Sequence, residues 1–84
     1  MIATIYRYRI DVLTELEAHG IRPRETTDPQ LVRDYLNDVY RYELRRLRDG
    51  VLNGEFPKAA LAARVIALRA RYRLMSVPVQ HWMT

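Results

Sequence analysis

The sequence predicts an all-α protein, a three-helix antiparallel bundle with an extended apolar C-terminal tail, in one domain over residues 1–84. Three observations support this prediction. Apolar residues recur with the helical period of 3.6 in three segments. The three glycines and four prolines fall between or at the ends of those segments. A hydrophobic fraction of 49% with 29% charged residues is typical of a folded chain rather than a disordered one.

We expect the first helix at residues 2–19, where six apolar residues share about a third of the helix circumference: Ile2, Ile5, Tyr6, Val12, Leu13 and Leu16. Gly20 suits the left-handed position after a helix, and Ile21 can then contact Leu16 in a Schellman motif. A strand is the alternative for residues 2–10, because β-prone residues alternate there with charged ones.

The second helix is expected at residues 28–53. Thr27 and Gln30 have the spacing of a capping box, and Pro29 between them suits the first turn of a helix. The apolar residues of this helix cover more than half of its circumference, whereas contact with one neighbour needs about 100°. We therefore expect neighbours on two sides, with Gly54 ending the helix.

The third helix is expected at residues 57–73, with Pro57 in its first turn, a leucine-rich stripe on one side and an alanine stripe on the other. In the tail, residues 74–84, Pro78 favours extended geometry. The tail is too apolar for a free terminus, so we expect it to lie across the helices or a partner. The predicted core consists of Ile5, Leu13, Leu16, Val32, Leu36, Val39, Leu47, Leu61, Val65 and Leu68.

Three charged residues interrupt the apolar faces. Arg9 lies on the apolar face of the first helix, and Glu43 and Arg46 lie within the apolar arc of the second. One prediction is a buried pair, within the fold or across a dimer, between Glu43 and either Arg9 or an arginine of the third helix, because an unpaired buried charge costs several kcal/mol. The alternative is that these side chains lie at the rim and reach water.

The composition narrows the function classes. No cysteine is present, so thiolate catalysis, disulfides and thiolate metal sites are excluded. The two histidines stand apart, at positions 19 and 81, and no nucleophile or phosphate-loop motif occurs. We expect no catalytic residue, metal or cofactor. With no apolar run of the ~18 residues that span a bilayer and no signal peptide, we expect a cytoplasmic protein.

The function expected from these patterns is a non-catalytic interaction or structural module that acts as a homodimer or as an accessory subunit of a larger protein. Its predicted contact surface consists of Tyr35, Tyr40, Tyr42, Leu44 and Trp82. A membrane-surface helix is disfavoured because the polar face of the second helix is nearly charge-balanced.

The alternative function is nucleic-acid binding. The net charge is +4, and residues 57–84 contain five bases and no acid. The predicted contacts are those five bases, namely Lys58, Arg64, Arg69, Arg71 and Arg73. Against this alternative, the arginines lie on two sides of the predicted third helix.

Overall fold

The computed structural model describes residues 3–84, and all regular structure in this range is helical. The helices are α1 (Ile10–Ala18), α2 (Pro29–Leu52) and α3 (Leu61–Arg71), with the 3-10 helices η1 (Lys58–Ala60), η2 (Arg73–Ser76) and η3 (Val79–Trp82). The all-α prediction is confirmed. Within the described range, extended residues pair at one isolated antiparallel bridge, between Tyr8 and Met83.

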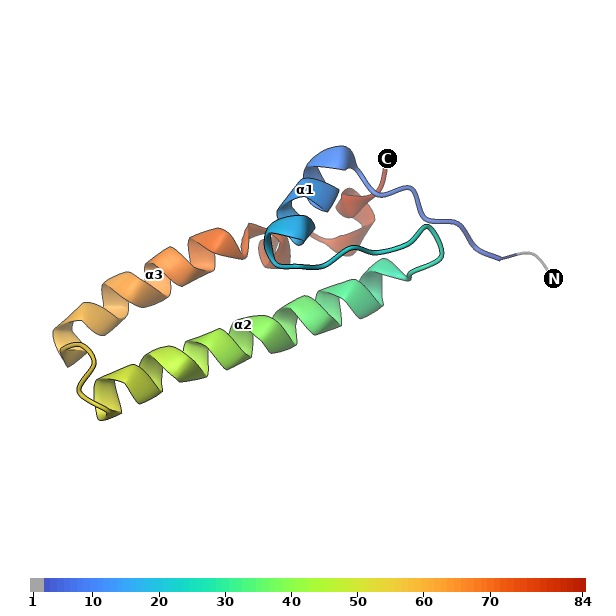
Figure 1. Cartoon of the computed structure of the whole chain (residues 1–84). Helices are drawn as coiled ribbons and strands as arrows, with labels where there is room; N and C mark the ends of the chain where they lie inside the picture. The colour runs from blue at the N-terminus through green and yellow to red at the C-terminus, as the bar shows by residue number, and fades with distance from the viewer. Residues whose placement is uncertain (1–2) are drawn as a thin grey trace.

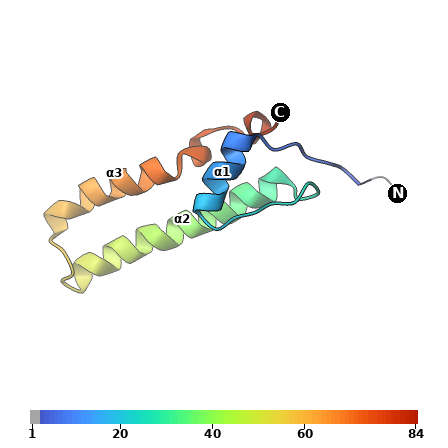
Figure 2. The same cartoon turned by 45° about the horizontal axis from the view of Figure 1, so that its top comes forward.

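The molecule is elongated, with extents of 55 × 21 × 17 Å. α2 and α3 form an antiparallel hairpin whose tip is the connection after α2 (Figure 1). α1 and the C-terminal segment both lie at the other end of the hairpin, where α1 crosses α2 (Figures 1 and 2). The tip half consists of α2, α3 and their connection, so each of these two helices has one long helical neighbour there (Figure 1).

The start of α2 follows from Asp28 and Pro29 rather than from the predicted capping box. The Asp28 carboxylate accepts a hydrogen bond from the backbone N–H of Gln30 at 2.9 Å, whereas the Thr27 hydroxyl accepts one from the backbone N–H of Arg24. The Gln30 amide donates to Asp34. Proline holds its preceding residue in an extended conformation, so Asp28 is the N-cap.

Both predicted glycine helix ends are confirmed. Gly20 and Gly54 have φ values of 74° and 73°, in the left-handed region. After α1, the N–H of Ile21 donates to the carbonyl of Leu16, which is the Schellman bond. After α2, the N–H of Glu55 donates in the same way to the carbonyl of Gly50.

The predicted helix over residues 2–19 is wrong for its first part, because α1 begins only at Ile10 and the described residues before it are extended. There the backbone pairs with the C-terminal segment: Arg9 N–H donates to the Trp82 carbonyl, and Thr84 N–H donates to the Arg7 carbonyl. The strand alternative was therefore closer for this stretch. Residue 2, the first of the predicted helix, lies outside the described range.

The predicted extended tail is also corrected, since residues 73–82 form the short turns η2 and η3 on either side of Pro78. The tail does lie across the helices, and it supplies part of the core.

The buried residues are Tyr8, Val12, Leu16, Val32, Leu36, Leu68, Tyr72, Leu74 and Trp82. Ile5, a predicted core residue, is 60% exposed. The third helix is shorter than predicted, because a 3-10 turn precedes it and Tyr72 ends it.

Candidate functional site

The predicted contact surface divides into three environments. Tyr35 and Tyr42 are 57% and 59% exposed on α2. Leu31 lies on the same side of α2 and is also exposed. Tyr40 and Leu44 are half-buried against the edge of the core. We name the exposed stripe of Leu31, Tyr35 and Tyr42 the tyrosine face.

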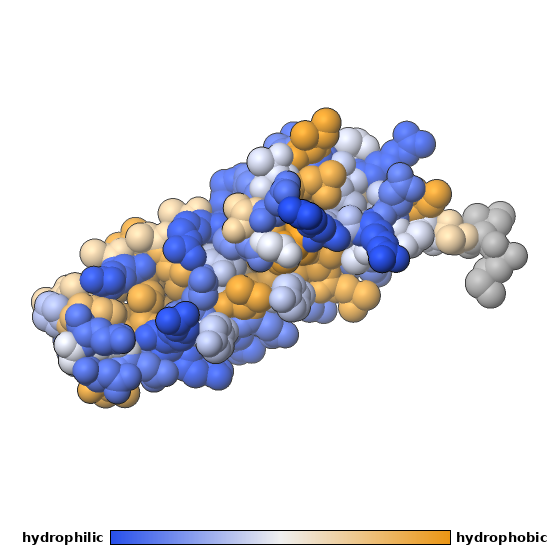
Figure 3. Space-filling model, viewed as in Figure 1, coloured by the Kyte–Doolittle hydropathy of each residue, from blue (hydrophilic) through white to orange (hydrophobic). Residues whose placement is uncertain are grey.

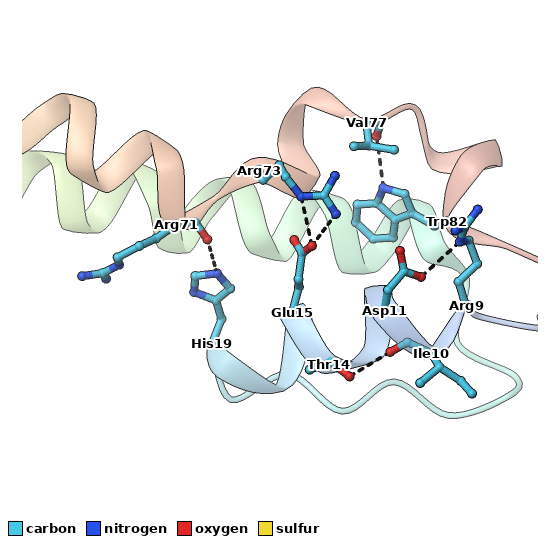
Figure 4. Close-up of polar contacts among 10 residues, drawn as sticks. All are labelled: Arg9, Ile10, Asp11, Thr14, Glu15, His19, Arg71, Arg73, Val77 and Trp82. Atoms are coloured by element: carbon cyan, nitrogen blue, oxygen red, sulfur yellow. Dashed lines mark hydrogen bonds and ion pairs between the residues drawn. The ribbon is translucent and has the colours of Figure 1, made fainter.

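Trp82 does not belong to this surface, and its assignment to the contact surface is wrong. Its side chain is fully buried, and its indole N–H donates to the Val77 carbonyl at 3.0 Å (Figure 4). A buried indole needs such an acceptor. The tail folds back at Pro78, which places Trp82 in the core beside the start of α1.

Glu43 forms the charge pair predicted with an arginine of the third helix. Its carboxylate accepts from the Arg71 guanidinium at 3.2 Å and from the Tyr72 hydroxyl at 2.5 Å. The pair is not buried as predicted, because the side chains of Glu43 and Arg71 are 32% and 62% exposed. Arg9 is not the partner; it pairs with Asp11 two residues along the chain (Figure 4).

An aromatic cluster surrounds this pair. The His19 ring stacks on Tyr72 with centroids 4.2 Å apart, and the Tyr40 ring meets Tyr72 edge-on at 5.3 Å. The His19 Nε2 atom also lies 2.7 Å from the carbonyl oxygen of Arg71 (Figure 4). Burial, and then the hydrogen bond to Glu43, raise the pKa of the Tyr72 hydroxyl, which therefore stays a neutral donor. The cluster joins α1, α2 and α3.

Most of the predicted nucleic-acid contacts already have partners within the protein. Arg73 pairs with Glu15 of α1, and Arg71 pairs with Glu43. Two other predicted contacts also have partners. Arg64 lies over the Phe56 ring, 4.0 Å from its centroid, and Arg69 donates a hydrogen bond to the Tyr40 hydroxyl at 3.4 Å. Lys58 is exposed on η1. Two of these five bases are thus paired with carboxylates, which reduces the positive field available to phosphates.

An open groove of about 600 Å³ follows one side of the hairpin. Arg46 lies in this groove, on the same side as Glu43. Its charged lining contains three acids and three bases: Glu43, Asp49, Glu55, Arg46, Arg64 and Arg71. Phe56 also lines it and packs over Gly50, where a Cβ atom would lie 2.6 Å from the ring. We name this side of the hairpin the mixed-charge face.

Within residues 3–84, no group of three or more potential ligand side chains could hold a metal ion. No helix in this range has the length and apolar character needed to cross a membrane. No protein-family model matches the chain, and neither a curated protein nor a solved structure is similar to it. The surfaces of the hairpin are therefore the basis for the functional proposal.

Proposed function

We propose that the protein is a small non-catalytic interaction module that acts as a homodimer or as an accessory subunit of a larger protein. The observation that carries this proposal is the exposure of large hydrophobic side chains, most of them on the α2–α3 hairpin. More than half of the surface is exposed at Ile5, Ile10, Leu31, Tyr35, Tyr42, Leu52 and Ile66. Apolar surface of this extent is typical of a protein–protein contact.

The hydrophobic residues are distributed along the molecule rather than gathered at one point. In the view of Figure 3 they alternate with hydrophilic residues over the hairpin and over the end that carries α1. Aromatic residues that are exposed between charges are enriched at protein interfaces. This distribution supports a contact along the length of the hairpin.

The tyrosine face is the surface that best suits a second copy. In an antiparallel two-fold contact centred on Tyr42, residue 38 of one copy lies opposite residue 46 of the other. Because the two-fold axis sets each edge of the face against the same edge of the second copy, Asp38 would face Arg45, the neighbour of residue 46, and a pair of opposite charges would form at each end of the contact. The face is therefore self-complementary in charge as well as apolar.

Sedimentation equilibrium tests the homodimer. The chain has a mass of 10.0 kDa, so a dimer has about twice that mass. We expect Tyr42→Glu to return the dimer to a monomer and Arg48→Glu, an exposed control that lies away from the tyrosine face on the same helix, to leave it intact. A wild-type monomer at every concentration would refute self-association and leave only the accessory-subunit form of the proposal.

Nucleic-acid binding remains the second candidate function, because residues 57–84 contain no acid. A gel-shift titration with single-stranded and duplex DNA and RNA at low salt tests it. Binding that weakens steeply with added salt would support this candidate. No shift under these conditions would remove it.

A further inference from the structure

The two long sides of the hairpin carry different charges. On the mixed-charge face, acids and bases are equal in number. On the opposite side, α2 presents Leu44 and Val51, flanked by Arg41 and Arg48, at positions that share one side of the helix. The two acids in this half of α2, Glu43 and Asp49, both line the mixed-charge groove instead.

The second helix of the hairpin continues this pattern. α3 presents Val65 and Ile66 on the same side, with Arg69 beside them. Ile66 is 68% exposed. No acid occurs in α3 or after it. We name this side the basic face, and define it by the apolar residues Leu44, Val51, Val65 and Ile66 and the bases Arg41, Arg48 and Arg69.

The basic face is covered at one end only. There the Arg33 guanidinium donates to the Met75 carbonyl, and Tyr40, Met75 and Ser76 line a small hollow. Toward the tip, beyond α1, the described chain has only α2 and α3 side by side, with their connection at the end (Figure 1). Arg41 and Arg48 form no ion pair within residues 3–84. Arg41 and Arg48 therefore have no carboxylate partner in this range, and Ile66 is exposed, whereas Leu44, Val51 and Val65 are half-buried along the seam. Arg69 donates to the Tyr40 hydroxyl across the seam.

We infer that the basic face binds an acidic amphipathic helix of another protein, laid along the seam between α2 and α3. This inference rests on the accessory-subunit form of the proposed function and names the chemistry of the partner. Leu44, Val51, Val65 and Ile66 would contact the apolar stripe of that helix, as in other helix-in-groove complexes. Acidic residues beside the stripe would face Arg41 and Arg48 on the α2 side of the seam and Arg69 within it, which favours this partner electrostatically.

Charge repulsion excludes a second copy of this chain, bound through its own basic face, as the occupant of the basic face. A two-fold contact between two basic faces sets the same patch against itself, so Arg41, Arg48 and Arg69 would meet their own copies. Like charges opposed in this way repel. Nucleic acid would satisfy the arginines but would leave the apolar seam against phosphates and water. An acidic amphipathic helix satisfies both the apolar and the charged parts of the face.

The test uses synthetic peptides with the full-length protein. The probe is a fluorescent peptide of about 18 residues, roughly five helical turns, with leucine at helical spacing and glutamate elsewhere. One control peptide has lysine in place of each glutamate, and the other has the leucines scrambled out of the stripe. Binding is followed by fluorescence anisotropy at about 50 mM salt, where charge interactions are little screened.

We expect the glutamate peptide to bind at least about tenfold more tightly than either control, with affinity that falls as salt is added. Arg48→Glu should weaken binding by about tenfold or more, whereas Arg46→Glu, the same change on the opposite side of α2, should leave it unchanged. Ile66→Asp should also weaken binding. Leu31→Asp is its matched control, because Leu31 is 65% exposed on the tyrosine face.

Three results would overturn the inference: no binding of the glutamate peptide, equal binding of the scrambled or lysine peptide, or equal effects of Arg48→Glu and Arg46→Glu. Binding of anionic vesicles or RNA through Arg48, without peptide binding, would also overturn it. Sedimentation of the same samples separates the two proposals. A dimer that Tyr42→Glu dissociates, with no peptide binding, would retain the interaction module and reject only the acidic partner.

Discussion

Removal of the Glu43 carboxylate tests whether the contact of α2 with the end of α3 stabilises the fold. In Glu43→Ala, the Tyr72 hydroxyl loses its acceptor while its side chain stays buried, at 3% exposure. An unsatisfied buried hydroxyl costs about 1–3 kcal/mol. Arg71 is 62% exposed and can return to water, so the lost ion pair adds less than about 1 kcal/mol. We expect a total loss of about 2–3 kcal/mol in the free energy of unfolding.

The controls separate the hydrogen bond from the charge. Glu43→Gln keeps an acceptor oxygen for Tyr72 and should cost about 1 kcal/mol or less. Tyr72→Phe removes the donor, and Glu43→Ala should be less harmful in that background. The double-mutant cycle should give a coupling energy of about 1–2 kcal/mol between the two residues.

The assay is equilibrium unfolding in urea, followed by far-UV circular dichroism and by the fluorescence of Trp82. This is the only tryptophan of the chain and is fully buried, so its emission reports on the core. A coupling energy below about 0.5 kcal/mol would refute the reasoning, because values of that size are within the error of additivity. Equal losses for the alanine and glutamine variants would refute it as well.

Two further predictions concern the hairpin tip and the response to alkali. Gly50→Ala should not stabilise the wild type, because a Cβ atom would lie 2.6 Å from the Phe56 ring. In a Phe56→Ala background the same change should stabilise the protein by about 1 kcal/mol, because alanine favours helix more than glycine does. Stabilisation of equal size in both backgrounds, measured by urea unfolding, would contradict this prediction. Burial, with smaller contributions from Asp28 and Tyr6, raises the pKa of Tyr8 from 10.0 to about 12. The unfolded chain therefore loses this proton first, and the stabilisation present below pH 10 falls as pH rises, by at most about 2 kcal/mol at pH 12. The urea midpoint should fall less steeply with pH in Tyr8→Phe than in the wild type. Equal slopes for the two proteins would rule out Tyr8 as the source of this pH dependence.

The sequence identified α2 to within a residue at each end, since its signals are local. Asp28 and Pro29 set its first turn, and Gly54 adopts the left-handed conformation that ends it. The pairing of Glu43 with an arginine of the third helix was also among the sequence predictions. A carboxylate in an apolar arc requires a partner, and the bases of the third helix were close in any hairpin.

The sequence did not identify the environments of the N-terminal segment and of Trp82. The alternation of β-prone residues was the signal that residues 3–9 are extended, but the helical period that continues to Leu16 outweighed it. The apolar tail predicted contact with the helices or with a partner, but it did not indicate which of the two would cover Trp82. Its burial depends on contact with the start of α1, at the opposite end of the chain.

The sequence by itself determined the helical class, the long second helix and the glycines that end two helices. Each of these depends on residues within a few positions of one another, whose conformational preferences act before any tertiary contact forms. Only the tertiary structure decided that Tyr8 and Met83 pair, that Trp82 is buried, and that the two sides of the hairpin differ in charge. These features depend on which distant segments meet, and local propensity contains no information about that choice.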